Sequence, residues 1–171
     1  MTGKVGAKHS SPWQDRVRIS PTSHRIRRRI HRGIGNVIFL PDTNAISVFL
    51  KGHDEQLNGL MTKHWEQIRL STIVIAEREY GIIRHKSGRK YQDRFKAMVE
   101  LLPQVDFTRE DSTQYAILRT TLERIGRNIG PMDTLIAAQA LRIGATVVTH
   151  NVGEFKRVPK LKVIDWQTAS V

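Results

Sequence analysis

The chain has 171 residues, no cysteine and a formal net charge of +12. This length suits one domain with its own core, and the lack of cysteine excludes disulfide frameworks, thiolate metal sites and cysteine nucleophiles. No apolar run approaches the ~18 residues of a membrane span, and no signal-peptide core follows the basic N-terminus. We therefore expect a soluble, cytoplasmic protein without membrane contact.

Residues 1–36 differ in composition from the rest of the chain, with nine Lys or Arg residues against one acid. They lack sustained apolar periodicity, so we expect a basic extension that is disordered until bound. The dense cluster at 25–32 suits a nucleic-acid arm or a segment outside the native domain, and we favour the second interpretation. The domain is therefore expected at 37–171. Its net charge of +4 suits a polyanionic substrate but also simple solubility.

From Val37 onward, apolar runs and helical patterns alternate, which predicts an α/β fold with a parallel sheet of about five strands. Strands are expected near 37–41, 68–71, 105–107, 146–149 and 161–165. Helices are expected at about 44–50, 54–65, 73–85, 90–101, 110–126 and 131–143. Ser71 predicts a helix N-cap, Pro131 the first turn of a helix, and Gly144 a helix C-terminus.

Four acidic residues stand beside short apolar runs at the expected ends of these elements: Asp42, Glu77, Asp133 and Glu154. Ligands of open parallel sheets bind outside the carboxyl ends of the strands, so these acids can converge there. Carboxylate oxygens suit Mg²⁺, with Mn²⁺ as an alternative, and we assign all four acids as metal ligands and catalytic residues. Water activated by the metal would cleave a phosphodiester and leave a 5′-phosphate and a 3′-hydroxyl.

Each acid alone has a simpler explanation. Asp42 can cap a helix, Asp133 can favour a helix dipole, Glu154 can be a loop charge, and the orientation of Glu77 is open. Four acids at matching element ends argue against coincidence. The sequence contains no dinucleotide fingerprint, phosphate-binding loop or His-Glu-x-x-His motif. Only His150, at the end of an apolar strand, is a histidine whose position invites a role.

At residues 37–168 the chain resembles the PIN-domain nucleases, and within them the VapC-type toxins of bacterial toxin–antitoxin pairs. Four segments carry the resemblance: Asp-Thr-Asn at 42–44, the Ala-Glu and Tyr-Gly pairs within 75–81, and the stretches 129–138 and 148–159. The resemblance implies a three-layer α/β/α fold. The extension at 1–36 departs from the family, whose members usually begin just before the first strand.

The resemblance also implies site roles and partners. Asp42, Glu77, Asp133 and Glu154 match the family's acidic positions, and Glu154 matches the most variable one. Thr43, Asn44 and Asn151 match polar residues that orient the acids or the scissile phosphate. The implied activity is Mg²⁺-dependent cleavage of a structured RNA such as tRNA or rRNA. The implied assembly is a homodimer with a neutralising antitoxin, which meets DNA only through the antitoxin complex.

Two hypotheses of other classes remain open. In the first, the chain is a non-catalytic RNA-binding or scaffold protein on a PIN-like fold, and its acids bind no productive metal. In the second, it is a DNA-binding regulator that uses the arginine-rich segment. Metal-dependent cleavage separates the nuclease from both. Retention of RNA binding without residues 1–36 separates the scaffold from the regulator.

Overall fold

The computed structural model describes residues 37–167. These belong to a compact unit, residues 36–171, that is distinct from residues 1–35. The expected disorder of residues 1–36 lies outside the described residues.

Five short strands, all paired in parallel, appear at the five expected places. They are β1 (Phe39–Pro41), β2 (Leu70–Ser71), β3 (Gln104–Val105), β4 (Thr146–Val148) and β5 (Lys162–Ile164). β4 pairs with β1 on one side and β5 on the other, while β2 pairs with β3. The expected α/β class with a parallel sheet is confirmed.

The sheet is less continuous than five strands in one ladder. Between β1 and the β2 region there is only one bridge, Phe39 to Ile68, with the Arg69 N–H donating to the Phe39 carbonyl over 2.9 Å. The strands are therefore hydrogen-bonded as a group of three and a group of two. Through that bridge they follow one another in the order β3-β2-β1-β4-β5.

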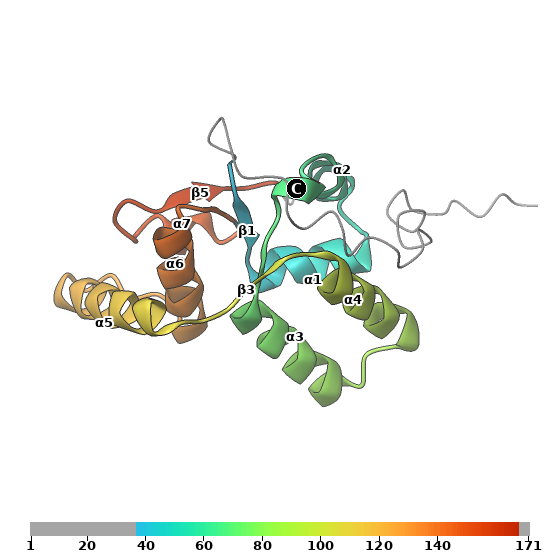
Figure 1. Cartoon of the computed structure of the whole chain (residues 1–171), viewed down its shortest axis with the longest axis horizontal. Coiled ribbons are helices and arrows are strands. Elements are labelled where there is room, and N and C mark those ends of the chain that lie inside the picture. Colours follow the sequence, from blue (N-terminus) through green and yellow to red (C-terminus); the bar gives the residue numbers. More distant parts are fainter. Residues whose placement is uncertain (1–36, 168–171) are drawn as a thin grey trace, which may run out of the picture. The chain divides into compact units, whose positions relative to one another are not determined.

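The helices lie between the strands along the chain (Figure 1). They are α1 (Thr43–Lys51), α2 (Glu55–Lys63), α3 (Thr72–His85), α4 (Arg89–Leu101), α5 (Arg109–Arg124), α6 (Pro131–Ile143) and α7 (Val152–Phe155), with a 3₁₀ turn η3 (Trp65–Gln67). The six expected helices are confirmed. Both η3 and α7 were missed, because segments this short have no measurable apolar periodicity. No helix within residues 37–167 is long and apolar enough to cross a membrane.

The expected helix boundaries are also confirmed. The Ser71 hydroxyl accepts a hydrogen bond from the Ile73 N–H at the start of α3, and Pro131 is the first residue of α6. Gly144 ends α6 with φ of 65°, a left-handed conformation that glycine adopts without steric cost. These signals fix where the acid-bearing turns of α3 and α6 begin.

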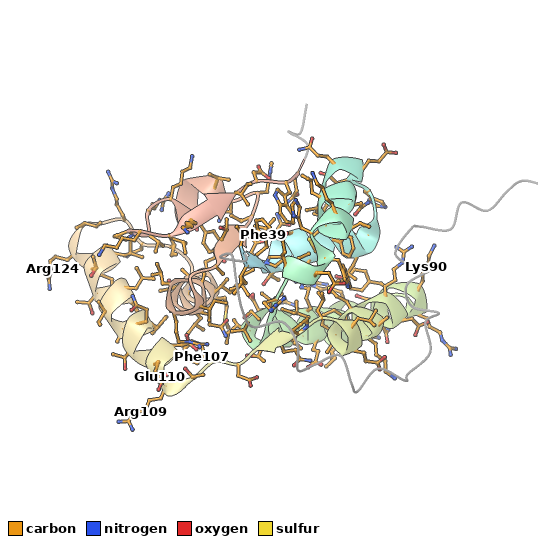
Figure 2. All side chains as sticks on the ribbon, turned by 45° about the horizontal axis from the view of Figure 1, so that its top comes forward. Phe39, Lys90, Phe107, Arg109, Glu110 and Arg124 are labelled. Carbon is orange, nitrogen blue, oxygen red and sulfur yellow. The ribbon has the colours of Figure 1, made fainter. Side chains whose placement is uncertain are left out.

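The core forms where the central strands meet the helices that cover them. Leu40 of β1, Val147 of β4 and Ile136 of α6 have no exposed surface. Phe39 is 8% exposed, and its ring contacts the rings of His64 and Trp166. In Figure 2, Phe39 lies in the interior, whereas Arg124 reaches outward from the end of α5. The core therefore holds β1 and β4 rigidly side by side.

The strand order has a consequence for ligand binding. The chain moves outward from β1 through β2 to β3, and then returns to the other side of β1 with β4 and β5. The order therefore reverses between β1 and β4. In open α/β sheets, ligands bind at such a reversal, outside the carboxyl ends of the strands. In this chain, the residues that directly follow these two ends are Asp42 and Thr149.

Candidate active site

Asp42 is held by three elements at once. It follows β1 and caps α1, where its Oδ1 accepts the Ala45 N–H over 2.7 Å. Its own backbone N–H donates to the Val148 carbonyl of β4 over 3.0 Å. Only 3% of its surface is exposed. The N-cap explanation for Asp42 is thus correct, but the cap also fixes a buried carboxylate at the end of the central strands.

Thr149 completes the anchoring of Asp42, and sequence reasoning missed it. Its hydroxyl donates to Oδ2 of Asp42 and accepts the N–H of Asn151 over 2.9 Å, and the residue is fully buried. The parallel register pairs Pro41 with Val148, so Asp42 and Thr149 are the next residues along the two strands. The sequence does contain a signal for Thr149. Its hydroxyl comes directly after an apolar strand, and that strand aligns with the strand that ends before Asp42.

Glu77 lies in the second turn of α3 and accepts a hydrogen bond from the Thr43 hydroxyl at the start of α1. The start of α3 is itself locked in place. The buried Ser71 hydroxyl donates to Oε1 of Gln139 on α6, and the Gln139 amide donates to the Val105 carbonyl over 3.1 Å. The helix carrying Glu77 is therefore fixed to the helix carrying Asp133.

Asp133 is the third residue of α6, where the helix dipole favours an ionised acid. The surroundings of Asp133 have a larger and opposite effect, because they favour its protonated form. Burial, and after it the negative charges of Asp42, Glu154 and Glu77, together raise the pKa of Asp133 to about 6. Its Oδ2 also lies against Gly130, 3.5 Å from where a β-carbon on that glycine would stand. The local dipole is thus outweighed by loss of solvent and by repulsion.

Burial likewise raises the pKa of Asp42, and the charge of Glu77 acts in the same direction. Hydrogen bonds from Ala45, Thr149 and the backbone of Asn44 oppose the shift by stabilising the carboxylate. The charges of the other three predicted acids thus all act on Asp133, although the four acids are spread over 112 residues of sequence.

The three polar residues predicted to orient the site are placed differently from one another. Thr43 contacts Glu77 through its side chain. Asn44 and Asn151 have exposed side chains, and they contact the site through their backbone N–H groups, which donate to Asp42 and Thr149 respectively. His150 is exposed and pairs with Asp165, its Nδ1 3.0 Å from that carboxylate.

The donor set fits a hard divalent cation, because every candidate ligand is a carboxylate oxygen. Within residues 37–167, no three acidic or histidine side chains converge tightly enough to form a complete ligand cluster. Mg²⁺ does not require one, since it keeps several waters and commonly takes one or two carboxylates together with substrate phosphates. Asp42 is the most buried of the four, and Asp133 is partly buried and is acted on by the charges of the other three.

Comparisons with known proteins agree with this fold. Residues 39–161 match the family model described as PIN domain. Ribonuclease VapC2 of Rickettsia felis is 36% identical over 133 residues, covering 76% of this chain and 98% of the relative. The chain therefore belongs to the PIN-domain family, on its VapC-type branch.

Two further comparisons describe that branch. The tRNA(fMet)-specific endonuclease VapC of Salmonella typhimurium is 27% identical over 128 residues, covering 75% of this chain and 97% of the relative. The crystal structure of VapBC2 from Rickettsia felis, bound to a DNA fragment from its promoter, superposes with a TM-score of 0.69 at 32% identity. That match covers 77% of this chain and 100% of the other.

Proposed function

We propose that the protein is a Mg²⁺-dependent endoribonuclease and the toxin of a VapBC-type toxin–antitoxin pair. The observation that carries this proposal is that Asp42 ends a strand at the strand-order reversal, and that the charges of Asp42, Glu77 and Glu154 all act on Asp133. Four carboxylates that repel one another are unfavourable for folding, and a divalent cation offsets that repulsion. Similarity to proteins named as ribonucleases supports RNA as the substrate.

In the proposed mechanism, Asp42 and Asp133 hold the cation, and Glu77 and Glu154 act directly or through water. When bound, Mg²⁺ activates a water for in-line attack on phosphorus and offsets charge on the leaving oxygen. The Thr149 hydroxyl and the Ala45 N–H keep the Asp42 oxygens in a fixed orientation, and Thr43 does the same for Glu77. We assign Asn44 and Asn151, whose side chains are exposed, to the scissile strand.

Water is the nucleophile in this scheme, so no ribose 2′-hydroxyl is required and the products carry a 5′-phosphate and a 3′-hydroxyl. For the substrate we propose a structured RNA, tRNA or rRNA, by analogy with the Salmonella relative named for tRNA(fMet). For assembly we propose a homodimer in the cytoplasm, neutralised by a cognate antitoxin. The Rickettsia felis complex with promoter DNA supports DNA contact through the antitoxin.

The test is cleavage of RNA by the purified chain with Mg²⁺, with and without EDTA. EDTA should abolish cutting, and Asp42→Asn should lower the rate by about 10²–10³-fold. Asp93→Asn is the matched control, because Asp93 lies on α4 with its side chain 72% exposed in a loose pair with Arg89. Cutting that persists undiminished in EDTA would overturn the metal mechanism. RNA binding without cutting would favour a non-catalytic scaffold.

A further inference from the structure

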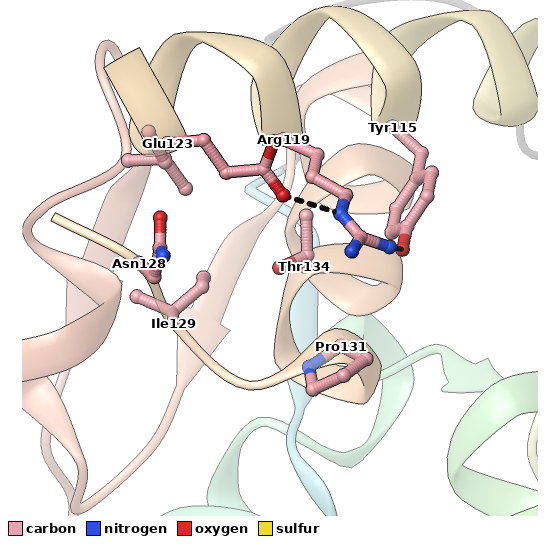
Figure 3. A pocket seen from close by; sticks show the side chains of 8 residues that line it. Tyr115, Arg119, Glu123, Asn128, Ile129, Pro131 and Thr134 are labelled. Atoms are coloured by element: carbon pink, nitrogen blue, oxygen red, sulfur yellow. Dashed lines mark hydrogen bonds and ion pairs between the residues drawn. The ribbon is translucent and has the colours of Figure 1, made fainter. Parts of the chain in front are cut away.

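A small pocket lies between α5 and the segment that leads into α6. Its volume is about 110 Å³. Figure 3 shows Tyr115, Arg119 and Glu123 along α5 on one side, with Asn128, Ile129 and Pro131 on the other. The Asn128 amide points toward α5 (Figure 3).

The α5 side of the pocket is held in shape by two contacts one helical turn apart. The Arg119 Nε donates to the Glu123 carboxylate over 2.8 Å, and another guanidinium nitrogen donates to the Tyr115 hydroxyl over 2.9 Å. The positive charge of Arg119 is thus matched within the pocket by Glu123. A neutral pocket with apolar walls from Leu122 and Ile129 does not favour an isolated phosphate.

The pocket is also connected to the catalytic machinery proposed above. Residues 128–131 form its wall and run directly into the first turn of α6, which carries Asp133. Gly130 stands between the lining residues Ile129 and Pro131 in the sequence, and the Asp133 carboxylate lies against it. A group bound in the pocket therefore lies against the segment that leads into Asp133.

An RNA base matches this pocket in chemistry. Bases of unpaired RNA are read by hydrogen bonds along their edges and by contacts to their faces. The Asn128 amide both donates and accepts hydrogen bonds, the Glu123 carboxylate accepts them, and Ile129 offers an apolar face. Guanine presents two donors, N1–H and N2–H, side by side to a carboxylate, whereas uracil presents only one.

We propose that this pocket receives one unpaired base of the RNA next to the cleaved phosphate, with guanine favoured through Glu123. This proposal rests on the proposed function, because it identifies the part of the substrate that the site reads. Asn128 and Glu123 are then specificity-determining residues, and the Arg119–Glu123 ion pair is the positioning element that presents the carboxylate.

Nucleotide binding to the full chain tests the pocket without metal and without cleavage. The probes are GMP, UMP and ribose 5-phosphate, titrated while backbone amide signals are followed by NMR. GMP should shift signals of residues 122–134 and bind more tightly than UMP, and ribose 5-phosphate should leave these signals unchanged. Equal shifts with ribose 5-phosphate would indicate a phosphate site and overturn the proposal. So would an absence of shifts in this segment.

Variants then assign the roles. Glu123→Gln should weaken GMP binding by about 3- to 10-fold and reduce the preference over UMP, as expected for one or two hydrogen bonds. Asn128→Ala should weaken both nucleotides. Arg124→Ala is the control, because Arg124 is exposed on the same helix and outside the pocket. Unchanged GMP binding in both pocket variants would overturn the assignment.

RNA cleavage separates this proposal from the function on which it rests. Oligonucleotides that differ only in the base beside the cut should be cleaved with different kcat/KM by the unmodified chain. Glu123→Gln should reduce that difference by lowering kcat/KM for the substrate with guanine beside the cut. If GMP binds in the pocket but no RNA is cut, the proposed function fails and the pocket stands. If RNA is cut without any base preference, the pocket proposal fails alone.

Discussion

The hydroxyl of Thr149 donates a hydrogen bond to Oδ2 of Asp42, across the ends of the paired strands β4 and β1. Oδ1 of Asp42 accepts the Ala45 N–H, so both carboxylate oxygens are held by hydrogen bonds. A carboxylate that is 3% exposed keeps its orientation without help from solvent. Thr149 therefore preorganises the most buried acid of the site.

Thr149→Val tests this relationship, because valine keeps the branched shape and removes only the hydroxyl. The change leaves the buried Asp42 Oδ2 without its donor, which should lower the free energy of unfolding by about 1–3 kcal/mol. It should also lower kcat/KM for RNA by at least about 10-fold, because Asp42 is no longer held in one orientation. Urea unfolding and cleavage kinetics measure the two effects.

Thr113→Val is the matched control for this variant. Thr113 lies on the exposed side of α5, where its hydroxyl donates to the Arg109 carbonyl one turn earlier. Loss of the Thr113 hydroxyl should change the free energy of unfolding by less than about 0.5 kcal/mol and leave RNA cleavage unaltered. Equal effects of the two substitutions would contradict the role assigned to Thr149.

Asp133 should make stability depend on pH in a direction opposite to that of an ordinary salt-bridged acid. Its folded-state pKa of about 6 lies above its usual value, so its contribution to stability is complete below about pH 4 and is lost as pH rises through about 6. Asp133→Asn should therefore raise Tm at pH 8 in EDTA, by on the order of 2–5 °C. The gain should become small at pH 4, because Asp133 is then protonated in the folded state and about half protonated in the unfolded state.

Added Mg²⁺ gives a second measurement on the same pair of proteins. It should raise the Tm of the unmodified chain in proportion to RT ln(1 + [Mg²⁺]/Kd), and raise that of Asp133→Asn less, because one ligand has lost its charge. Melts in EDTA and in Mg²⁺ at both pH values compare the two. If the variant melts lower in EDTA and both proteins respond alike to Mg²⁺, the acid is only a helix-end charge.

Much of the candidate site could be predicted from where strands end and helices begin in the sequence. Apolar runs and capping signals place Asp42 after a strand and Asp133 in the first turn of a helix, and the parallel topology then brings both to one edge. Thr149 was missed because a single hydroxyl carries no periodicity, and its value depends on the register that aligns Pro41 with Val148. The single bridge between Phe39 and Ile68 was not predictable either, since strand pairing of two residues depends on tertiary packing.

Ser71 should affect catalysis from a distance, because it fixes the helix that carries Glu77. Ser71→Ala removes an N-cap and leaves the buried Gln139 Oε1 without its donor. It should therefore lower the free energy of unfolding by about 1–3 kcal/mol. It should also lower kcat under conditions where the variant remains fully folded. Circular dichroism melts define those conditions, and steady-state cleavage measures the rate.

The control for Ser71 is another helix cap. Thr108 caps α5, a helix that bears none of the four acids, and forms a reciprocal capping box with Asp111. Thr108→Ala should lower the free energy of unfolding by a comparable amount, about 0.5–2 kcal/mol. It should leave kcat unchanged at temperatures where the protein is folded. A rate loss that simply follows stability in both variants would show that Ser71 has no positioning role.

Deletion of residues 1–36 tests the basic extension, which carries nine Lys or Arg residues against one acid. The family match begins at residue 39, so the truncated chain should fold with an unchanged circular dichroism spectrum and retain its cleavage rate at saturating RNA. Any loss of RNA affinity should be uniform across sequences, because phosphate contacts carry no base information. The dependence of affinity on salt should become less steep, since fewer counterions are released.

Binding of two unrelated RNAs at several salt concentrations measures both effects. A truncated protein that unfolds would place the domain boundary before residue 37, and an affinity loss confined to one RNA would assign sequence recognition to the extension.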